Sequence, residues 1–120
     1  MKFCWSTIYV KDMEKSLKFY QEVVGLKLDR KFESGPGMEI AFLGEGETKI
    51  ELIYSENNTN INIGKDISWG FNVDSLGDMI EFVKEKNIEI HDGPHQPNPN
   101  TKFFYVLDPN GLKIQFVEVS

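Results

Sequence analysis

The chain has 120 residues, which is enough for one shared hydrophobic core and too few for two independent cores. Its 13 basic and 19 acidic residues leave a net charge of -6, and this charge excludes functions that need a basic surface, such as binding nucleic acid or anionic lipid. Cys4 is the single cysteine, and neither a membrane-spanning apolar run nor a secretory signal is present, so we expect a cytoplasmic protein without an internal disulfide.

The first half of the chain predicts the order strand, helix, strand, strand, strand. Residues 3–10 are rich in β-forming residues, and their alternation would place Trp5, Thr7 and Tyr9 on the face opposite to Cys4. Asp12 is placed to cap a helix whose apolar residues recur at helical spacing and which ends at Gly25. Three further strands are predicted over residues 26–32, 38–43 and 48–54.

The second half predicts the same order of elements. A strand over residues 67–73 precedes a helix that begins at Asp74 or Ser75 and ends at Asn87, a residue type that tolerates the left-handed conformation. The remaining strands are predicted over residues 88–90, 103–107 and 112–119, and a tight turn over residues 108–111 joins the last two. Residues 91–101 form a proline-rich insertion, which is where a lid over a site is expected.

An internal repeat joins the two halves. The phrase Lys49-Ile50-Glu51-Leu52 recurs 64 positions later as Lys113-Ile114-Gln115-Phe116. Apolar residues around the first helix recur around the second at nearly the same spacing. We therefore predict an α+β fold with one domain over residues 1–120, made of two tandem βαβββ modules. Module one covers about residues 1–54, a linker about 55–65, and module two about 66–120.

The repeat makes two pairs of positions equivalent: Trp5 with Ser68, and Glu51 with Gln115. If the modules pack with pseudo-twofold symmetry, with the helices outside, their mixed sheets curl around a cavity where these four side chains meet. Without the repeat, Glu51 would be interpreted as the water-facing residue of an alternating strand.

The phrases that run from Tyr9 to Tyr20, from Val24 to Leu26, from Ile50 to Leu52 and from Asp108 to Ile114 resemble the vicinal oxygen chelate superfamily. That group includes glyoxalase I, bleomycin and fosfomycin resistance proteins and extradiol dioxygenases, and the resemblance covers nearly the whole chain. It implies the paired-module fold, but the scaffold hosts many chemistries.

The resemblance also implies where a metal would lie, because members that use one place a His on the first strand and a Glu on the last strand of each module. The matching positions here are Trp5, Glu51, Ser68 and Gln115, and only Glu51 keeps a usual ligand type. We therefore expect no metal and no other cofactor, and the metal-dependent glyoxalase route should fail. His91 and His95 lie outside these positions and are interpreted as surface residues of the proline-rich loop.

Three functions remain open for such a cavity. In the first, a binding protein holds an aromatic or cationic small molecule on Trp5 and Glu51. In the second, a metal-independent lyase or isomerase, similar to lactoylglutathione lyase, uses Glu51 as a general base. In the third, Trp5 fills the cavity and nothing binds. The candidate ligand-binding residues are Trp5, Thr7, Tyr9, Ser68, Asn72 and Gln115, and the candidate catalytic residue is Glu51.

Two further predictions concern assembly and the core. Members of this family with two modules commonly dimerise, so the resemblance implies a homodimer, with the cavity formed within one chain or across the dimer. Cys4 is predicted to face the helix as a small buried residue, and Trp69 is predicted to face the same way in module two.

Overall fold

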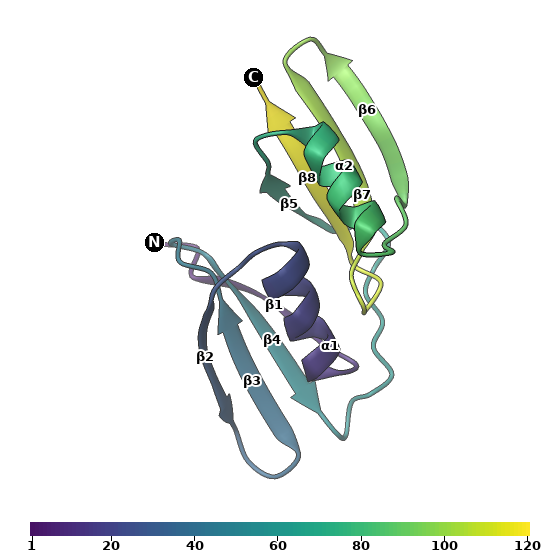
Figure 1. Cartoon of the computed structure of the whole chain (residues 1–120). Coiled ribbons are helices and arrows are strands. Elements are labelled where there is room, and N and C mark those ends of the chain that lie inside the picture. The colour runs from purple at the N-terminus through teal and green to yellow at the C-terminus, as the bar shows by residue number, and fades with distance from the viewer. The chain divides into compact units, whose positions relative to one another are not determined.

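The computed structural model describes residues 1–120, which divide into two compact units, Met1–Ile63 and Gly64–Ser120. Each unit contains a four-stranded mixed sheet with a helix against one face (Figure 1). The elements of the first unit are β1 (Trp5–Tyr9), α1 (Met13–Lys18), a π-helical segment η1 (Phe19–Val23), β2 (Leu28–Glu33), β3 (Met38–Leu43) and β4 (Lys49–Ser55). Those of the second are β5 (Ser68–Asn72), α2 (Leu76–Glu85), β6 (Asp92–Asn98), β7 (Thr101–Leu107) and β8 (Lys113–Val119).

Both sheets have the same topology, which confirms the predicted pair of βαβββ modules and the α+β class. The strand order is β1-β4-β3-β2 in the first unit and β5-β8-β7-β6 in the second. The first and last strands of each module pair in parallel, and the other neighbours are antiparallel. The pairing of Trp5 with Lys49 and of Ser68 with Lys113 confirms the equivalence that the repeat predicted.

The helices begin and end where their capping residues predict. The backbone N–H of Lys15 donates to the Asp12 carboxylate at 3.0 Å, and that of Asp78 donates to the Ser75 hydroxyl at 3.2 Å. Gly25 and Asn87 follow the helical segments with φ of 83° and 59°, the left-handed conformation that these residue types tolerate. Neither α1 nor α2 is long and apolar enough to cross a membrane.

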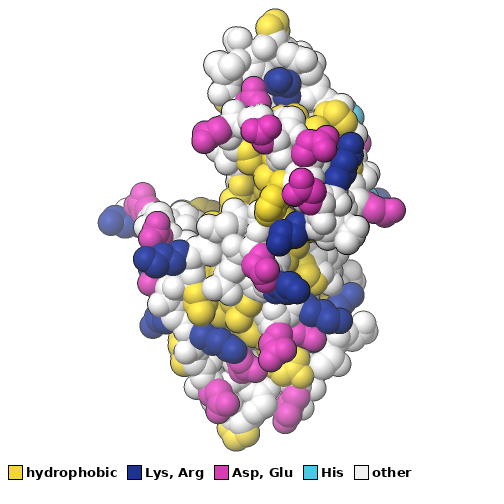
Figure 2. All heavy atoms as spheres, in the orientation of Figure 1, with side chains coloured by type: hydrophobic (Ala, Val, Ile, Leu, Met, Phe, Trp, Pro, Cys, Tyr) yellow, Lys and Arg dark blue, Asp and Glu magenta, His cyan; other side chains and the backbone are white.

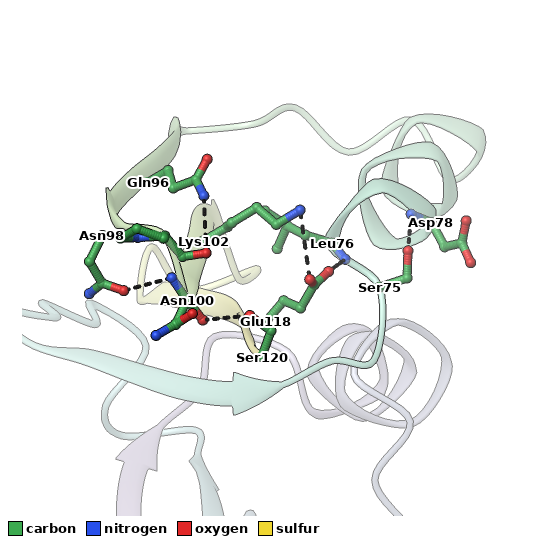
Figure 3. Close-up of polar contacts among 10 residues, drawn as sticks. Ser75, Leu76, Asp78, Gln96, Asn98, Asn100, Lys102, Glu118 and Ser120 are labelled. Carbon is green, nitrogen blue, oxygen red and sulfur yellow. Dashed lines mark hydrogen bonds and ion pairs between the residues drawn. The ribbon is translucent and has the colours of Figure 1, made fainter.

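Figure 3 shows that a second side chain supports the start of α2. The carboxylate of Glu118, on β8, accepts a 2.7 Å hydrogen bond from the backbone N–H of Leu76 and lies 3.6 Å from the Lys102 ammonium. An acidic group is favourable here because the first N–H groups of a helix have no partner within the helix. Glu118 therefore ties α2 to the last strand of its sheet.

Buried residues lie between the helix and the sheet of each module. Alternate residues of the last strand face the helix, and they are buried: Ile50 and Leu52 in β4, and Ile114 and Phe116 in β8. The tight turn before β8 is confirmed, since the Asp108 carboxylate accepts 2.8 Å hydrogen bonds from the backbone N–H groups of Asn110 and Leu112. This alternation leaves the odd residues of β4 and β8 on the opposite face of each sheet.

Two predictions about the proline-rich stretch are wrong. Residues 88–90 form no strand, and the residues expected to form a loop contain the edge strand β6, Asp92–Asn98. Prolines are compatible with an edge strand because one side of it has no neighbour, and register shifts on either side of His95 interrupt its pairing with β7. The stretch is therefore a part of the sheet.

The prediction that Cys4 is buried is also wrong, because its side chain is exposed. The strand β1 begins at Trp5, so Cys4 lies just before it. Trp69 does lie on the helix-facing side of β5, as predicted, but it is half-buried. Acidic and basic side chains are intermingled on the face of each unit that Figure 2 shows.

Candidate functional site

A single row of side chains crosses the first sheet on the face opposite to α1. The strand register pairs Arg30 of β2 with Phe42 of β3, Phe42 with Glu51 of β4, and Glu51 with Thr7 of β1. Residues in register on neighbouring strands share one face and lie close enough to interact. The row therefore holds a guanidinium, an aromatic ring, a carboxylate and a hydroxyl in that order.

Glu51 is half-buried and is held in place by Thr7. The Thr7 hydroxyl donates a 2.6 Å hydrogen bond to Oε1 of Glu51. The other carboxylate oxygen, Oε2, has no hydrogen-bond partner among the described contacts of the chain. Carboxylate oxygens that are not fully paired accept hydrogen bonds from ammonium, amide or hydroxyl donors. The arrangement thus presents one oriented acceptor on the sheet face.

Aromatic rings flank this acceptor. The indole of Trp5 meets the ring of Phe42 edge-on, with 5.3 Å between the centroids, and it is 46% exposed. Phe32 stacks on Phe42 at 6.5 Å, and Tyr9 lies two residues beyond Thr7 on the same face of β1 and is 38% exposed. Large aromatic surfaces that remain exposed beside a polar group are typical of ligand sites.

Two cations on this side of the first sheet were not predicted as site residues. The Arg30 guanidinium carbon lies 4.5 Å from the Phe42 ring centroid and 5.6 Å from that of Phe32. The Lys49 ammonium lies 2.8 Å from the Asp29 carboxylate, and its hydrogen bond lowers the pKa of Asp29 from the usual value of 3.8. A β-bulge at Asp29 decides which residues of β2 face this way, and no pattern in the sequence reveals a bulge of this kind.

The second module carries a corresponding row with different chemistry. Its register pairs Asp92 of β6 with Tyr105 of β7, Tyr105 with Gln115 of β8, and Gln115 with Gly70 of β5. The Gln115 amide donates to the Tyr105 hydroxyl at 3.3 Å. Ser68 and Asn72 are exposed on the same face, on either side of Gly70. The hydrogen-bonded Gln115 and the two short polar residues therefore occupy one surface, as predicted.

His95 also lies on this surface, within an edge strand and not in a loop. Its ring lies 5.5 Å from that of Phe103, and its Nε2 is 2.9 Å from an oxygen of Asp92. The imidazole is exposed, as the sequence predicted for a surface histidine. Asp92 thus contacts an imidazole within its own module, whereas its positional equivalent in module one, Arg30, packs on aromatic rings and forms no salt bridge.

The structure thus divides the predicted site residues into two groups. Trp5, Thr7, Tyr9 and Glu51 share one sheet face in module one, and Ser68, Asn72 and Gln115 share the equivalent face in module two. That the two groups line one cavity stays a prediction, based on the repeat.

A comparison with protein families decides the affiliation of the chain. Residues 3–116 match the model of the Glyoxalase/Bleomycin resistance protein/Dioxygenase superfamily. The chain belongs to this superfamily. The match covers both modules, so it confirms the resemblance drawn from the repeated phrases and from the residues around the first helix.

The chain is similar in sequence to lyases and similar in fold to a binding protein. The chain is 31% identical to a lactoylglutathione lyase of Neisseria meningitidis, over 98% of this chain and 91% of that protein. A glyoxalase I structure from Zea mays matches 98% of the chain with a TM-score of 0.84 and 25% identity, and the chain spans 47% of that longer protein. TnmS3, an antibiotic binding protein from Streptomyces sp. CB03234, shares the fold over the whole chain with a TM-score of 0.79 and 20% identity, and 97% of its own length is covered.

Proposed function

We propose that this superfamily member is a metal-independent small-molecule binding protein that holds an aromatic or cationic ligand against Trp5 and Glu51. The observation that carries the proposal is the Thr7–Glu51 hydrogen bond of 2.6 Å beside the exposed indole of Trp5. The hydroxyl orients a carboxylate whose second oxygen is free to accept from the ligand. The indole supplies a flat surface for stacking and attracts cations through its π-face.

The side chains at the metal positions of the family support a metal-independent function. An indole offers no lone pair, and the hydroxyl of Ser68 and the amide of Gln115 are weak ligands for a divalent transition metal. The Gln115 amide already bonds to Tyr105. Neither unit contains a group of three or more His, Cys, Asp or Glu residues placed to hold a metal ion. This donor set does not fit the metal of glyoxalase I.

The names of the relatives favour a second candidate, a lyase or isomerase that acts without a metal. Lactoylglutathione lyases of several bacteria are about 30% identical to the chain over nearly its full length. In this candidate, Glu51 would be the general base. The two candidates differ in whether Glu51 binds a ligand or transfers a proton.

Calorimetric titration with benzyltrimethylammonium, an aromatic cation, tests the binding function. Trp5→Ala and Glu51→Gln should each weaken binding at least severalfold, because they remove the stacking surface and the charge. Trp69→Phe and Glu22→Gln, which change the other indole and an exposed carboxylate outside the site, should leave it unchanged. Equal affinity in all five proteins would rule out this site.

A turnover assay separates the two candidates. The wild-type protein is incubated with a hemithioacetal substrate and, separately, with the thioester lactoylglutathione. Each incubation is carried out with and without a metal chelator. Turnover that survives the chelator and disappears in Glu51→Gln, while binding persists, establishes the lyase or isomerase and rejects the pure binding function. We further propose that the protein is cytoplasmic and that it forms a homodimer. Sedimentation equilibrium tests the homodimer, because it measures the mass of the particle in solution.

A further inference from the structure

We infer that the ligand of this face carries a carboxylate in addition to its cationic or hydrogen-bond-donating group, and that Arg30 binds this carboxylate. The inference deepens the proposed function and depends on it. It assigns the ligand to the class of aromatic molecules with opposite charges at their two ends.

The first observation is that Arg30 packs against aromatic rings and forms no salt bridge with an acidic side chain. Its guanidinium packs on Phe42 and Phe32, at 4.5 and 5.6 Å from the ring centroids, and it takes part in none of the five salt bridges of the chain. The adjacent acidic residue, Asp29, pairs with Lys49 at 2.8 Å. Arg30 is exposed to solvent, and its packing on the two rings holds the guanidinium on this face of the sheet.

Stacking leaves the binding edge of the guanidinium available. A ring contacts the flat face of the group, while its five N–H donors lie in the plane and point away from the ring. Two of these donors match the two oxygens of a carboxylate. Because the rings already restrict the side chain, Arg30 loses less conformational freedom on binding than an unsupported arginine would.

The second observation is the position of Arg30 in the row. Phe42 lies between Arg30 and Glu51 in register, so the two charged residues stand two strands apart, which is about 10 Å between their backbones. A single benzene ring with one charged substituent at each end has a comparable length. Phe42 is itself buried, so the ring of such a ligand would lie against the exposed indole of Trp5, with its ammonium group at Glu51 and its carboxylate at Arg30.

The second module provides an internal contrast. The position equivalent to Arg30 is Asp92, which His95 already contacts at 2.9 Å, and the position equivalent to Glu51 is the neutral Gln115. Opposite charges on either side of an aromatic residue therefore occur in the row of module one alone. A charge pattern that merely stabilised the shared fold would be expected in both copies.

The test uses 4-(aminomethyl)benzoate, the matching 4-(aminomethyl)benzamide, and benzylamine, titrated by calorimetry at neutral pH. The wild-type protein should bind the benzoate about tenfold more tightly than the benzamide, the ratio that one charge-assisted hydrogen-bond pair supplies. Arg30→Met keeps the apolar stem and should abolish this preference without changing the affinity for benzylamine. Lys31→Met, which removes the next cation along β2 on the other face, is the matched control and should keep the preference.

The outcomes separate this inference from the function on which it depends. If benzylamine binds and Trp5→Ala weakens it, the binding function holds. Equal affinity for the benzoate and the benzamide, or a preference that survives in Arg30→Met, then overturns the role of Arg30 alone. If none of the three compounds binds, or if Trp5→Ala changes nothing, the proposed function and the carboxylate inference fail together.

Discussion

Thr7 and Glu51 are 44 positions apart in the chain, and a 2.6 Å hydrogen bond joins the hydroxyl of one to the carboxylate of the other. The parallel pairing of β1 with β4 brings them into register, and the helix between these strands makes parallel pairing possible. The βαβββ order therefore builds an oriented carboxylate directly into the sheet.

Replacing Thr7 by Val should weaken the binding of benzyltrimethylammonium while changing stability little. The hydrogen bond lies at the surface, so its loss should reduce the free energy of unfolding by less than about 1 kcal/mol. The carboxylate loses its orientation, and affinity should fall several-fold in calorimetric titration. Thr7→Ser keeps the hydroxyl and should bind like the wild-type protein; equal loss in both variants would show that the hydroxyl has no part.

The pair of Asp29 and Lys49 should make stability depend on pH in the acid range. The lysine lowers the pKa of Asp29 in the folded protein below the usual value of 3.8, so the folded state favours the ionised form. The stabilisation is complete at a pH well above 3.8 and is lost as the pH falls from about that value through the lower folded-state pKa. Carboxyl NMR titration should place the Asp29 transition below 3.8, and Lys49→Met should return it to the usual range.

The start of α2 should depend on two acceptors from different parts of module two. Ser75→Ala removes the acceptor for the Asp78 N–H, and Glu118→Ala removes the acceptor for the Leu76 N–H. Each change should lower the free energy of unfolding by about 1 kcal/mol, measured in urea. Ser75→Asp keeps an acceptor at the cap and should retain wild-type stability, whereas a loss as large as that of Ser75→Ala would argue against capping.

Equivalent core residues should be comparably important in the two modules. Leu52 and Phe116 occupy matching positions of β4 and β8 and are 0% and 1% exposed. Their replacement by Ala should cost about 2–5 kcal/mol, because each change removes buried surface and leaves a cavity. Thermal unfolding measures the loss of stability in these variants. Leu107→Ala, at a position that is 41% exposed, serves as the control and should reduce the free energy of unfolding much less.

Purified protein without an affinity tag should retain no stoichiometric transition metal after dialysis. The residues at the metal positions of the family include an indole, a hydroxyl and an amide, which bind such ions weakly. Elemental analysis by mass spectrometry measures the metal content. Nickel or zinc retained at a stoichiometric level, and lost in Glu51→Gln, would contradict the metal-independent function.

The repeat and the local patterns were sufficient to predict the two modules, most of their strands, the Asp12 cap and, as one of two candidates, the Ser75 cap. Local patterns are reliable there, because alternation and helical spacing reflect which face of each element is buried. The stretch with Pro94 and Pro97 was predicted incorrectly, because the tolerance of an edge strand for proline depends on which of its sides has a neighbour. The burial of Cys4 was predicted incorrectly, because the residue at which a strand begins depends on its pairing with a neighbouring strand.

The sequence by itself determined the fold class, the superfamily and the residues at the positions where relatives hold a metal. Those conclusions depend on order and spacing along the chain. Only the tertiary structure decided that Thr7 orients Glu51 and that Arg30 stacks on Phe42 in the same row. Register between strands and a bulge at Asp29 produce that row, and both depend on contacts between segments that are distant in the sequence.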